Sequence, residues 1–437
     1  MIDPDTVADG AAPLPASSGP EAFASTVAQS SGLHRAPPFD ATLAVADGVA
    51  VAPATLRQTR PSVLPRVEPG EGDTLRLVHE PKERYRIGER LGVGGMGEAL
   101  RADDMDIGRP VAIKRLLPEV ATASGLARFV DEVRIVGSLD HPNVVPLHDV
   151  GLDAEGRYFF VMKYCDGQTL ESVIERLAAA DPAAHAEWPW ERRVDVFLGL
   201  LRALEYAHSQ GIVHRDVKPA NVMVGRYGEV WLMDWGIAKR KDRAELAWTD
   251  EPSATLHPRA AARTTRHGAI IGSPAYMAPE QARGDHARVD ARSDLYAACV
   301  LFHELLTTTH YLEHRMGSLA ELLDAVQNET PRIVFHGIRA RNGQGPVPAE
   351  LLHFVARGLA KDPAARFQSA GEMIQALQEA AAGKIRVECP VTLTKRVLRE
   401  VGAFVDRNPA LAVPVLVTLV GSVVLVPVMA ALLAWLR

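Results

Sequence analysis

The pattern of hydrophobic and polar positions changes several times along this chain. Residues 1–80 are rich in Ala, Pro, Ser, Thr and Asp, and their apolar residues follow neither a helical nor a strand period. A segment of this kind buries too little apolar surface to offset the entropy lost on ordering it. We therefore expect residues 1–80 to be a disordered tail.

From Tyr85 onward the pattern indicates strands first and helices later. Residues 111–114 and 158–164 are short apolar runs typical of strands. After Gly167 the apolar residues recur at three- and four-residue steps, which makes one apolar stripe along a helix: Val194, Phe197, Leu198, Leu201 and Leu204, with a similar helix around Leu301, Leu305 and Leu306. A strand-rich part followed by a helix-rich part predicts a two-lobed α+β fold.

The C-terminal part of the chain combines basic residues with an uncharged stretch. Residues 383–408 are expected to form a linker that contains Lys395, Arg396, Arg399 and Arg407. Residues 409–436 contain no charged residue, and roughly 20 apolar residues suffice to span a bilayer as a helix. We expect a transmembrane helix there, with a buried helix of a soluble domain as the alternative.

The basic residues of the linker also predict an orientation. Only Arg437 follows the uncharged stretch, so the positive-inside rule places everything upstream in the cytoplasm. The expected arrangement is a single-pass C-terminal anchor in the cytoplasmic membrane, with residues 383–408 as a juxtamembrane linker.

Composition narrows the class of protein. A chain of 437 residues exceeds what one hydrophobic core usually organises, so two or more segments are expected. The formal charge of −6 provides no basic excess to neutralise phosphates, so we expect no nucleic-acid partner. The three cysteines are far apart and form no CxxC pair, which favours neither a zinc site nor a disulfide framework. The N-terminus lacks the basic region of a signal peptide.

A glycine-rich run provides the first candidate for phosphate binding. Gly92, Gly94 and Gly97 have the spacing G-x-G-x-x-G. Glycines let a backbone turn approach phosphates at a distance where a Cβ atom would clash. Dinucleotide-binding proteins use the same spacing, but there the glycines open a helix. Here the strand with Lys114 follows at the short range of a β-hairpin, so Lys114 can reach the phosphates from the neighbouring strand.

Residues 214–221 and 234–236 carry the densest set of specialised polar residues. They read His-Arg-Asp-Val-Lys-Pro-Ala-Asn and Asp-Trp-Gly. Asp216 is suited to accept the proton of a substrate hydroxyl, and Asn221 and Asp234 offer the oxygen ligands that Mg²⁺ prefers. A simple polar loop between strands would not require these residue types at these offsets.

Together with Ala278-Pro279-Glu280, these motifs resemble, in order, those of a eukaryotic-type (Hanks-type) bacterial Ser/Thr protein kinase. The resemblance covers residues 85–382 and implies a kinase domain with an N-lobe over 85–164 and a C-lobe over 165–382. It implies ATP and Mg²⁺, or alternatively Mn²⁺, as cofactors. It also implies Ser and Thr hydroxyls of proteins as substrates, and a homodimer is common among similar kinases.

The resemblance assigns a role to each matching residue. The catalytic residues would be Lys114, Glu132, Asp216 and Lys218, and the metal ligands Asn221 and Asp234. Glu132 is preferred to Asp131 as the partner of Lys114 because its F-x-x-E spacing resembles that of bacterial kinases. The nucleotide would contact Leu91, Gly92, Gly94, Gly97, Ala112, Lys114, Met162, Tyr164 and Cys165.

Further residues would be architectural by the same resemblance. Glu280 would pair with Arg366, and Asp294 would cap the backbone of the catalytic loop. Ser273 stands where a Thr that contacts Asp216 and Lys218 is common.

Some positions depart from the pattern of the family. Ala99 stands where Val is common over the adenine, and Trp235 replaces Phe, so its indole N–H requires a hydrogen-bond partner. The segment of about residues 241–267 is longer than usual. We expect autophosphorylation there, at Thr264 or Thr265, to order the segment; the alternative is a mobile insertion with no regulatory role.

Two other classes of function remain open at this point. A pseudokinase scaffold would keep the fold and lose turnover, but such proteins usually lack one of the catalytic residues that are present here. A kinase-fold phosphotransferase for small molecules is the other. The A-P-E segment and Lys218 favour protein substrates.

Overall fold

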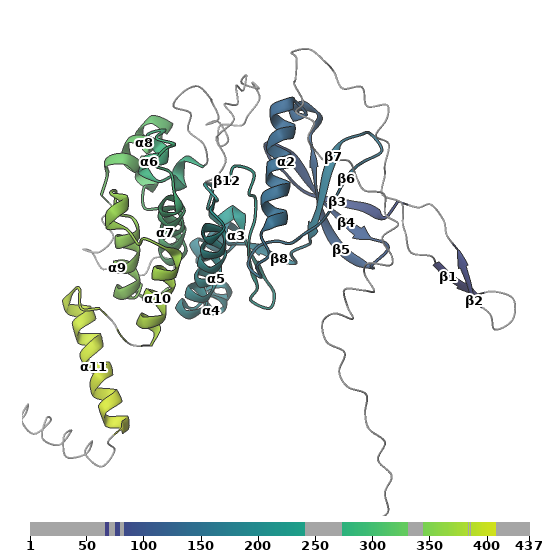
Figure 1. Cartoon of the computed structure of the whole chain (residues 1–437). Helices are drawn as coiled ribbons and strands as arrows, with labels where there is room; N and C mark the ends of the chain where they lie inside the picture. Colours follow the sequence, from purple (N-terminus) through teal and green to yellow (C-terminus); the bar gives the residue numbers. More distant parts are fainter. Residues whose placement is uncertain are drawn as a thin grey trace, which may run out of the picture. The chain divides into compact units, whose positions relative to one another are not determined.

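The computed structural model describes the following parts of the chain: residues 66–69, 75–78, 83–240, 273–330, 344–382, 384 and 386–407. The described residues up to Lys163 form a β-rich lobe, and those from Gly167 form a mainly helical lobe (Figure 1). This agrees with the two-lobed α+β fold expected from the hydrophobic pattern.

The N-terminal lobe contains a five-stranded antiparallel sheet with the strand order β3-β4-β5-β7-β6. The strands are β3 (Tyr85–Val93), β4 (Gly97–Asp104), β5 (Arg109–Leu116), β6 (Leu147–Leu152) and β7 (Tyr158–Lys163). The short helix η2 (Pro118–Val120) connects β5 to α2 (Ala123–Ser138). Thr122 caps α2 by accepting a hydrogen bond from the backbone N–H of Gly125 at 3.1 Å.

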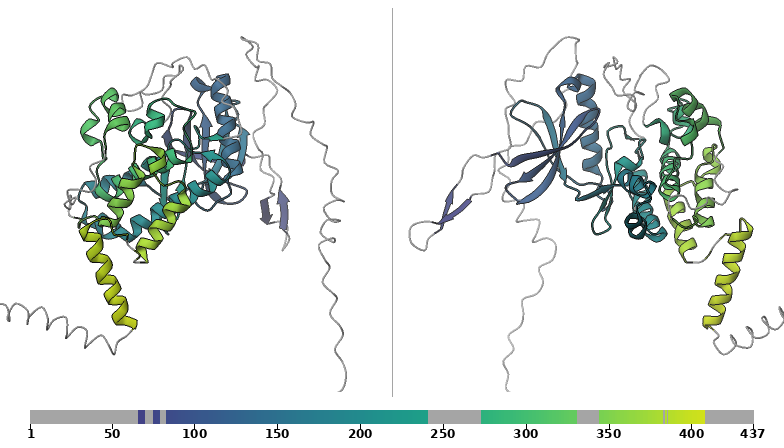
Figure 2. Two further views of the ribbon diagram at one scale, coloured as in Figure 1. Left: turned by 60° about the vertical axis from the view of Figure 1, so that its left-hand side comes forward. Right: turned by 180° about the vertical axis from the view of Figure 1, so that it is seen from behind.

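Helix α2 lies beside the sheet in the views of Figures 1 and 2. Phe129 of α2 packs with Leu116 and Phe160 of the sheet in one small hydrophobic cluster. A separate small cluster within the sheet contains Tyr85, Leu100, Ala102, Val111, Ile113, Phe159 and Val161. The hydrophobic core of this lobe therefore consists of two small clusters and not of one large cluster.

The C-terminal lobe begins with β8 (Gly167–Thr169) and is built mainly from helices. They are α3 (Leu170–Ala178), α4 (Pro182–Glu187), α5 (Trp190–Ser209), α6 (Pro279–Ala282), α7 (Ala291–Thr307), α8 (Leu319–Asn328), α9 (Ala349–Gly358) and α10 (Ala370–Ala381), with the short helices η3 (Pro219–Asn221), η4 (Pro274–Tyr276), η5 (Glu313–Arg315) and η6 (Pro363–Ala365). The short strands are β9 (Ile212–Val213), β10 (Val222–Gly225), β11 (Val230–Leu232) and β12 (Lys239–Arg240).

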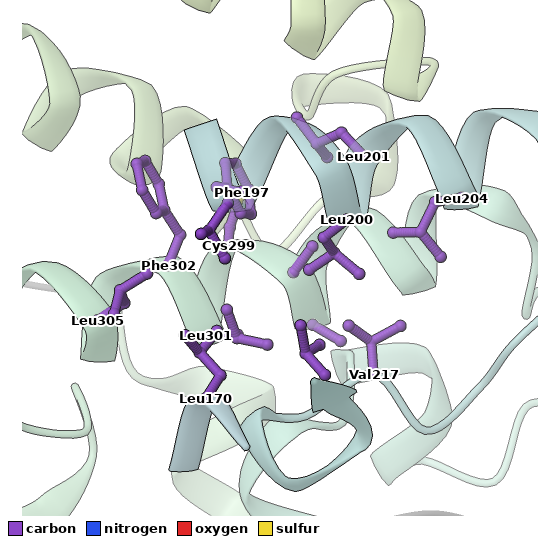
Figure 3. Close-up of a cluster of buried hydrophobic side chains, with 14 of the residues drawn as sticks. Leu170, Phe197, Leu200, Leu201, Leu204, Val217, Cys299, Leu301, Phe302 and Leu305 are labelled. Carbon is purple, nitrogen blue, oxygen red and sulfur yellow. The ribbon is translucent and has the colours of Figure 1, made fainter. Parts of the chain in front are cut away.

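The predicted apolar stripes form the core of this lobe. Phe197 of α5 stacks on Phe302 of α7 with ring centroids 4.0 Å apart, and Leu201, Leu204, Leu301 and Leu305 lie in the same buried cluster (Figure 3). Close packing of this kind supplies most of the stability of a helical domain. The two helices predicted around these residues are thereby confirmed.

Part of the segment expected to be disordered has defined structure. Strands β1 (Arg66–Pro69) and β2 (Leu75–Val78) pair as an antiparallel hairpin within residues 1–80. The prediction is wrong for these two strands. The physical reason is local: Val67, Leu75 and Leu77 are residues that favour strands, and Gly70 and Gly72 lie in the connection, where glycine favours a turn.

The linker predicted over residues 383–408 is largely a helix, α11 (Pro390–Arg407). Its apolar residues Leu393, Val397 and Val401 recur every four positions, which favours a helix over an irregular linker. None of the helices within the described residues combines the length and the apolar character that crossing a bilayer requires. The expected transmembrane segment, residues 409–436, lies outside the described residues.

Candidate active site

The glycine-rich run forms the turn of the hairpin between β3 and β4, and the N–H of Gly94 donates to the carbonyl oxygen of Gly97 at 2.8 Å. A Cβ atom at Gly97 would lie 2.5 Å from the carbonyl oxygen of Arg115 on β5, so packing requires glycine there. A Cβ atom at Gly92 would meet nothing within 4 Å. The open space beside Gly92 leaves the backbone accessible to a ligand, which fits a phosphate-binding turn.

Lys114 links the sheet, α2 and the loop after β11. Its Nζ donates to Oε1 of Glu132 at 2.5 Å and to Oδ1 of Asp234 at 3.1 Å. Glu132 is only 3% exposed. The partner of Lys114 on α2 is therefore Glu132, the residue preferred from the sequence, rather than Asp131. Burial alone would lower the pKa of Lys114, but the two carboxylates raise it above its usual value.

The other residues expected to contact the nucleotide lie on neighbouring strands and just after β7. Ala112 of β5 is directly opposite Met162 of β7, and Tyr164 and Cys165 follow that strand. The side chain of Leu91 on β3 is 45% exposed. Burial raises the pKa of the Cys165 thiol to about 11, so this thiol stays protonated at neutral pH. These predicted nucleotide-contacting residues thus lie on β3 and β5, at the end of β7 and just after it.

The carboxylate of Asp216 has three donors around it. Lys218 Nζ donates to Oδ2 at 2.7 Å, the backbone N–H of Ser273 donates to Oδ1 at 3.0 Å, and Asn221 Nδ2 donates to Oδ2 at 3.3 Å. Lys218 Nζ also donates to Oγ of Ser273 at 2.9 Å, which ties the catalytic loop to the start of the segment before α6. Three donors hold this carboxylate in one orientation, as a group that positions a hydroxyl requires.

Asn221 and Asp234 meet the chemical requirements of a Mg²⁺ site. Asn221 Nδ2 donates to the backbone oxygen of Asp216 at 2.8 Å, which orients the amide. Burial would raise the pKa of Asp234, but Lys114 holds it below its usual value, so the carboxylate is ionised. The side chain of Asp234 is 49% exposed. One ionised carboxylate and one amide oxygen are hard ligands of the kind that Mg²⁺ takes together with phosphates.

The backbone of both loops is strained. Arg215 has φ +69° and Asp234 has φ +57°, values that residues other than glycine rarely adopt. Asp294 of α7 accepts from the backbone N–H groups of His214 and Arg215, each at 2.8 Å. This is the backbone cap expected from the sequence, and it holds the strained turn in place. Such strain is typical of functional sites that the surrounding structure supports.

The ion pair expected beneath the A-P-E motif is present. Arg366 donates to Oε1 and Oε2 of Glu280 at 2.8 and 2.9 Å, and Ser293 donates to the same carboxylate at 2.6 Å. Both partners are almost fully buried. Burial would raise the pKa of Glu280, but its hydrogen bonds with Arg366 lower it.

One expectation for the Asp-Trp-Gly motif is wrong. Trp235 is buried against the ring of His214, with ring centroids 4.5 Å apart, but among the described residues its indole N–H has no acceptor. The ring itself lies in the large buried cluster of the C-terminal lobe. At the next position, a Cβ atom on Gly236 would lie 2.5 Å from Cε of Met96, so a larger residue there would displace the flexible end of Met96.

Several residues that support the site were missed from the sequence. His208 of α5 donates from Nε2 to Asp294 at 2.8 Å, across 86 positions of sequence. Gln281 donates to the backbone oxygen of Arg215 at 3.1 Å and accepts from the N–H of Ala278 at 3.0 Å. Because Gln281 directly follows the A-P-E motif, its position in the sequence could have marked it as a residue that supports the site. His208 lies on an ordinary amphipathic helix and has no such signal.

Lys163 is a further residue whose surroundings only the structure shows. Its Nζ lies 4.4 Å from the ring centre of Trp231 on β11, a cation–π contact that joins the end of β7 to the C-terminal lobe. The expected phosphorylation sites Thr264 and Thr265 lie outside the described residues.

Comparison with known proteins agrees with this geometry. Residues 85–379 match the family described as "Protein kinase domain". A probable serine/threonine-protein kinase of Streptomyces coelicolor is 35% identical over 309 residues, which cover 68% of this chain and 40% of that protein. PknB of Mycobacterium tuberculosis, a serine/threonine-protein kinase, is 34% identical over 298 residues, covering 67% of this chain and 42% of PknB.

PknD of Chlamydia trachomatis, another serine/threonine-protein kinase, is 32% identical over 305 residues, covering 68% of this chain and 31% of PknD. The chain thus matches less than half the length of these relatives. The match to the family nevertheless covers every motif described above. On this evidence and on the geometry of the site, the chain belongs to the protein kinase family.

Proposed function

We propose that this chain is an ATP- and Mg²⁺-dependent protein kinase that transfers the γ-phosphoryl group of ATP to Ser and Thr hydroxyls of proteins, in the class of non-specific serine/threonine protein kinases. The observation that carries the proposal is the contact of Lys218 with both Asp216 and Ser273. It joins the proposed catalytic carboxylate to the segment before the A-P-E motif, where a protein substrate would bind.

Each side chain has a separate task in this proposal. Asp216 orients the attacking hydroxyl and accepts its proton as attack proceeds. Lys218, beside it, offsets the negative charge that builds up on the transferred group. Lys114 holds the α- and β-phosphates, and Glu132 keeps the ammonium group in position. Because Lys114 also contacts Asp234, a shift of α2 would disturb both the lysine and the metal ligand.

Asn221 and Asp234 would hold the metal ion. The bound ion would supply positive charge that offsets the charge of the phosphates. Manganese has similar ligand preferences and is the alternative ion. Leu91, Ala112, Met162, Tyr164 and Cys165 would line the adenine site, and Gly92, Gly94 and Gly97 would face the phosphates.

The pseudokinase alternative is not favoured. Pseudokinases usually lack at least one polar group of the catalytic site. Lys114, Glu132, Asp216, Asn221 and Asp234 are all present. Lys114 contacts Glu132 and Asp234, and Asn221 contacts Asp216.

The test is phosphorylation by the full chain with Mg²⁺ and γ-labelled ATP, on a generic protein substrate, beside Asp216→Asn and Lys114→Met. We expect each substitution to lower kcat/KM by at least about a hundredfold. Binding of a fluorescent ATP analogue to Asp216→Asn checks that the variant is folded. Equal label from all three proteins would contradict the proposal, and binding without label in the unmodified chain would favour the scaffold.

We also infer regulation by autophosphorylation at Thr264 or Thr265, which supports the same function. Arg215 stands next to Asp216, where a guanidinium can bind an activation-segment phosphate. Treatment with a phosphatase should lower activity, and Thr264→Ala with Thr265→Ala should have the same effect. Full activity after complete dephosphorylation would remove this switch.

We further propose that residues 409–436 anchor the kinase domain to the cytoplasmic face of a membrane. The uncharged sequence and the basic residues before it support this proposal. Extraction of a membrane fraction at alkaline pH tests it, because an integral anchor stays with the lipid. We also propose that the chain forms a homodimer. Chemical cross-linking in the same membranes tests this, since a dimer should give a cross-linked band of twice the mass.

A further inference from the structure

Helix α11 (Pro390–Arg407) carries an apolar surface that the rest of the described protein does not cover. Val391, Leu393, Val397, Leu398 and Val401 are between 46% and 66% exposed. At 100° per residue these side chains fall on one half of the helix. Scattered exposed apolar residues are ordinary, but a continuous stripe indicates a surface that is covered by something else.

The opposite side of α11 attaches the helix to the C-terminal lobe. Lys395 donates to Oε2 of Glu350 on α9 at 2.8 Å, and Thr392 is 1% exposed. His353 of α9 lies 3.1 Å from Glu388, just before the helix. These polar contacts hold the first turns of α11, whose ribbon is drawn in Figure 2, and the apolar stripe stays exposed.

The charges of α11 indicate what the stripe contacts. Lys395, Arg396, Arg399 and Arg407 outnumber the two acidic residues Glu400 and Asp406. Lys395 and Arg396 border the stripe on its two sides. Within the described residues, Arg396 forms an exposed pair with Glu400, which contributes little and can be exchanged for another anion. An apolar stripe bordered by cations is typical of a helix that lies in the headgroup region of an anionic bilayer.

The position of α11 in the chain favours the same partner. The uncharged residues 409–436 begin two positions after the helix ends. A membrane anchor there would hold α11 within reach of the bilayer surface, so little further entropy is lost when it binds.

We propose that α11 is an interfacial helix, whose apolar stripe enters the headgroup region of anionic phospholipids while its other side holds the kinase domain through α9. This inference rests on the proposed membrane anchorage. The consequence is that the catalytic lobe has a defined orientation relative to the membrane, instead of hanging from a flexible linker.

The experiment uses the full chain reconstituted in vesicles of phosphatidylcholine alone, or with about 30% phosphatidylglycerol, enough for a negative surface potential. Hydrogen exchange of the backbone amides of residues 393–407 is followed by mass spectrometry. We expect exchange to slow by about tenfold or more in the anionic vesicles relative to the neutral ones.

Matched variants separate the faces of the helix. Val401→Glu places a negative charge on the stripe, and Ala403→Glu places the same charge on the other side. Val401→Glu should abolish the protection and Ala403→Glu should reduce it by no more than about fivefold, the effect of one charge near the surface. Arg396→Gln with Arg399→Gln should remove the difference between the two lipids. Phosphorylation of a generic substrate by each variant shows that the kinase domain stays folded.

Flotation of the vesicles distinguishes this inference from the proposed anchorage. If the chain floats with both lipids but α11 exchanges at the same rate in both, the anchorage stands and the interfacial helix is wrong. If the chain floats with neither, both proposals fail. Equal loss of protection in Val401→Glu and Ala403→Glu would also overturn the inference. So would protection that appears only at high protein-to-lipid ratios with α11–α11 cross-links, which would assign the stripe to a second copy.

Discussion

The two lobes hold their parts of the active site in different ways. In the N-terminal lobe, the sheet that carries Lys114 has two small hydrophobic clusters, and Lys114 reaches Asp234 through a contact whose carboxylate is half exposed. In the C-terminal lobe, Asp294 and the pair of Glu280 with Arg366 are buried beneath the catalytic loop next to one large core. The loop with Asp216 is thus supported by buried contacts, whereas the position of Lys114 depends on a few contacts.

Helix α2 connects the N-terminal lobe to the C-terminal lobe. Its first half packs on the sheet through Phe129, but Ile135, Val136 and Leu139 belong to the core of the C-terminal lobe. The following loop is fixed as well, because Asn143 Nδ2 donates to the carbonyl oxygen of Val230 at 2.8 Å. Glu132 is thus positioned by both lobes, so its ion pair with Lys114 depends on how the two lobes are aligned.

The largest expected effect comes from breaking the buried pair of the C-terminal lobe. Arg366→Met leaves the carboxylate of Glu280 buried with only Ser293 as a side-chain donor, and we expect a loss of about 3–5 kcal/mol in the free energy of unfolding. Urea denaturation followed by tryptophan fluorescence measures it. The control, Arg396→Met, breaks the exposed pair with Glu400 and should change stability by less than about 1 kcal/mol. Similar values for the two variants would contradict the claim that burial makes the pair of Glu280 with Arg366 important for stability.

An effect of intermediate size is expected from pH. Burial lowers the pKa of His303 and of His310 to about 4 in the folded protein, and the unfolded chain takes up protons near the ordinary value of about 6.5. Their contribution is therefore fully present above pH 6.5 and is lost as the pH falls toward 4, by up to about 3 kcal/mol for each histidine.

Thermal denaturation between pH 4.5 and 7.5 measures this dependence. In the variant with His303→Gln and His310→Gln, the melting temperature should vary less over that range, although the variant is less stable at pH 7.5. The paired carboxylates with lowered pKa values, such as Asp294, titrate at lower pH and do not obscure the result. An unchanged slope in the double variant would show that other groups cause the acid sensitivity.

The smallest effect is expected in the N-terminal lobe. Ala99 of β4 lies opposite Gly92 and Lys114 in the sheet, beside the proposed adenine site. Ala99→Val adds two carbons of apolar surface, worth up to about tenfold in ATP affinity at roughly 0.8 kcal/mol per CH₂ group. We expect a lower KM for ATP and no change in the unfolding of the C-terminal lobe. A KM that stays the same or rises would contradict the placement of Ala99 against the adenine.

Much of the site was predictable from the sequence because its parts are local. The turn at Gly92–Gly97, the strand with Lys114 and the loops at 214–221 and 234–236 each depend on residues close together in the chain. Their backbone preferences and polar groups specify a hairpin, a strand and two polar loops without reference to the rest of the molecule. The apolar stripe of α5 could be predicted for the same reason, because it depends on residues three and four positions apart.

The tertiary structure decided which distant groups meet. His208 and Asp294 are 86 positions apart, and Lys163 and Trp231 come from different lobes. Neither contact follows from a period or a motif, because it depends on how helices and strands pack. Two other features also depend on the packed chain: Trp235 has no acceptor for its N–H within the part of the chain that the structure describes, and the stripe of α11 is exposed. Burial and exposure are properties of the packed chain and not of a local segment.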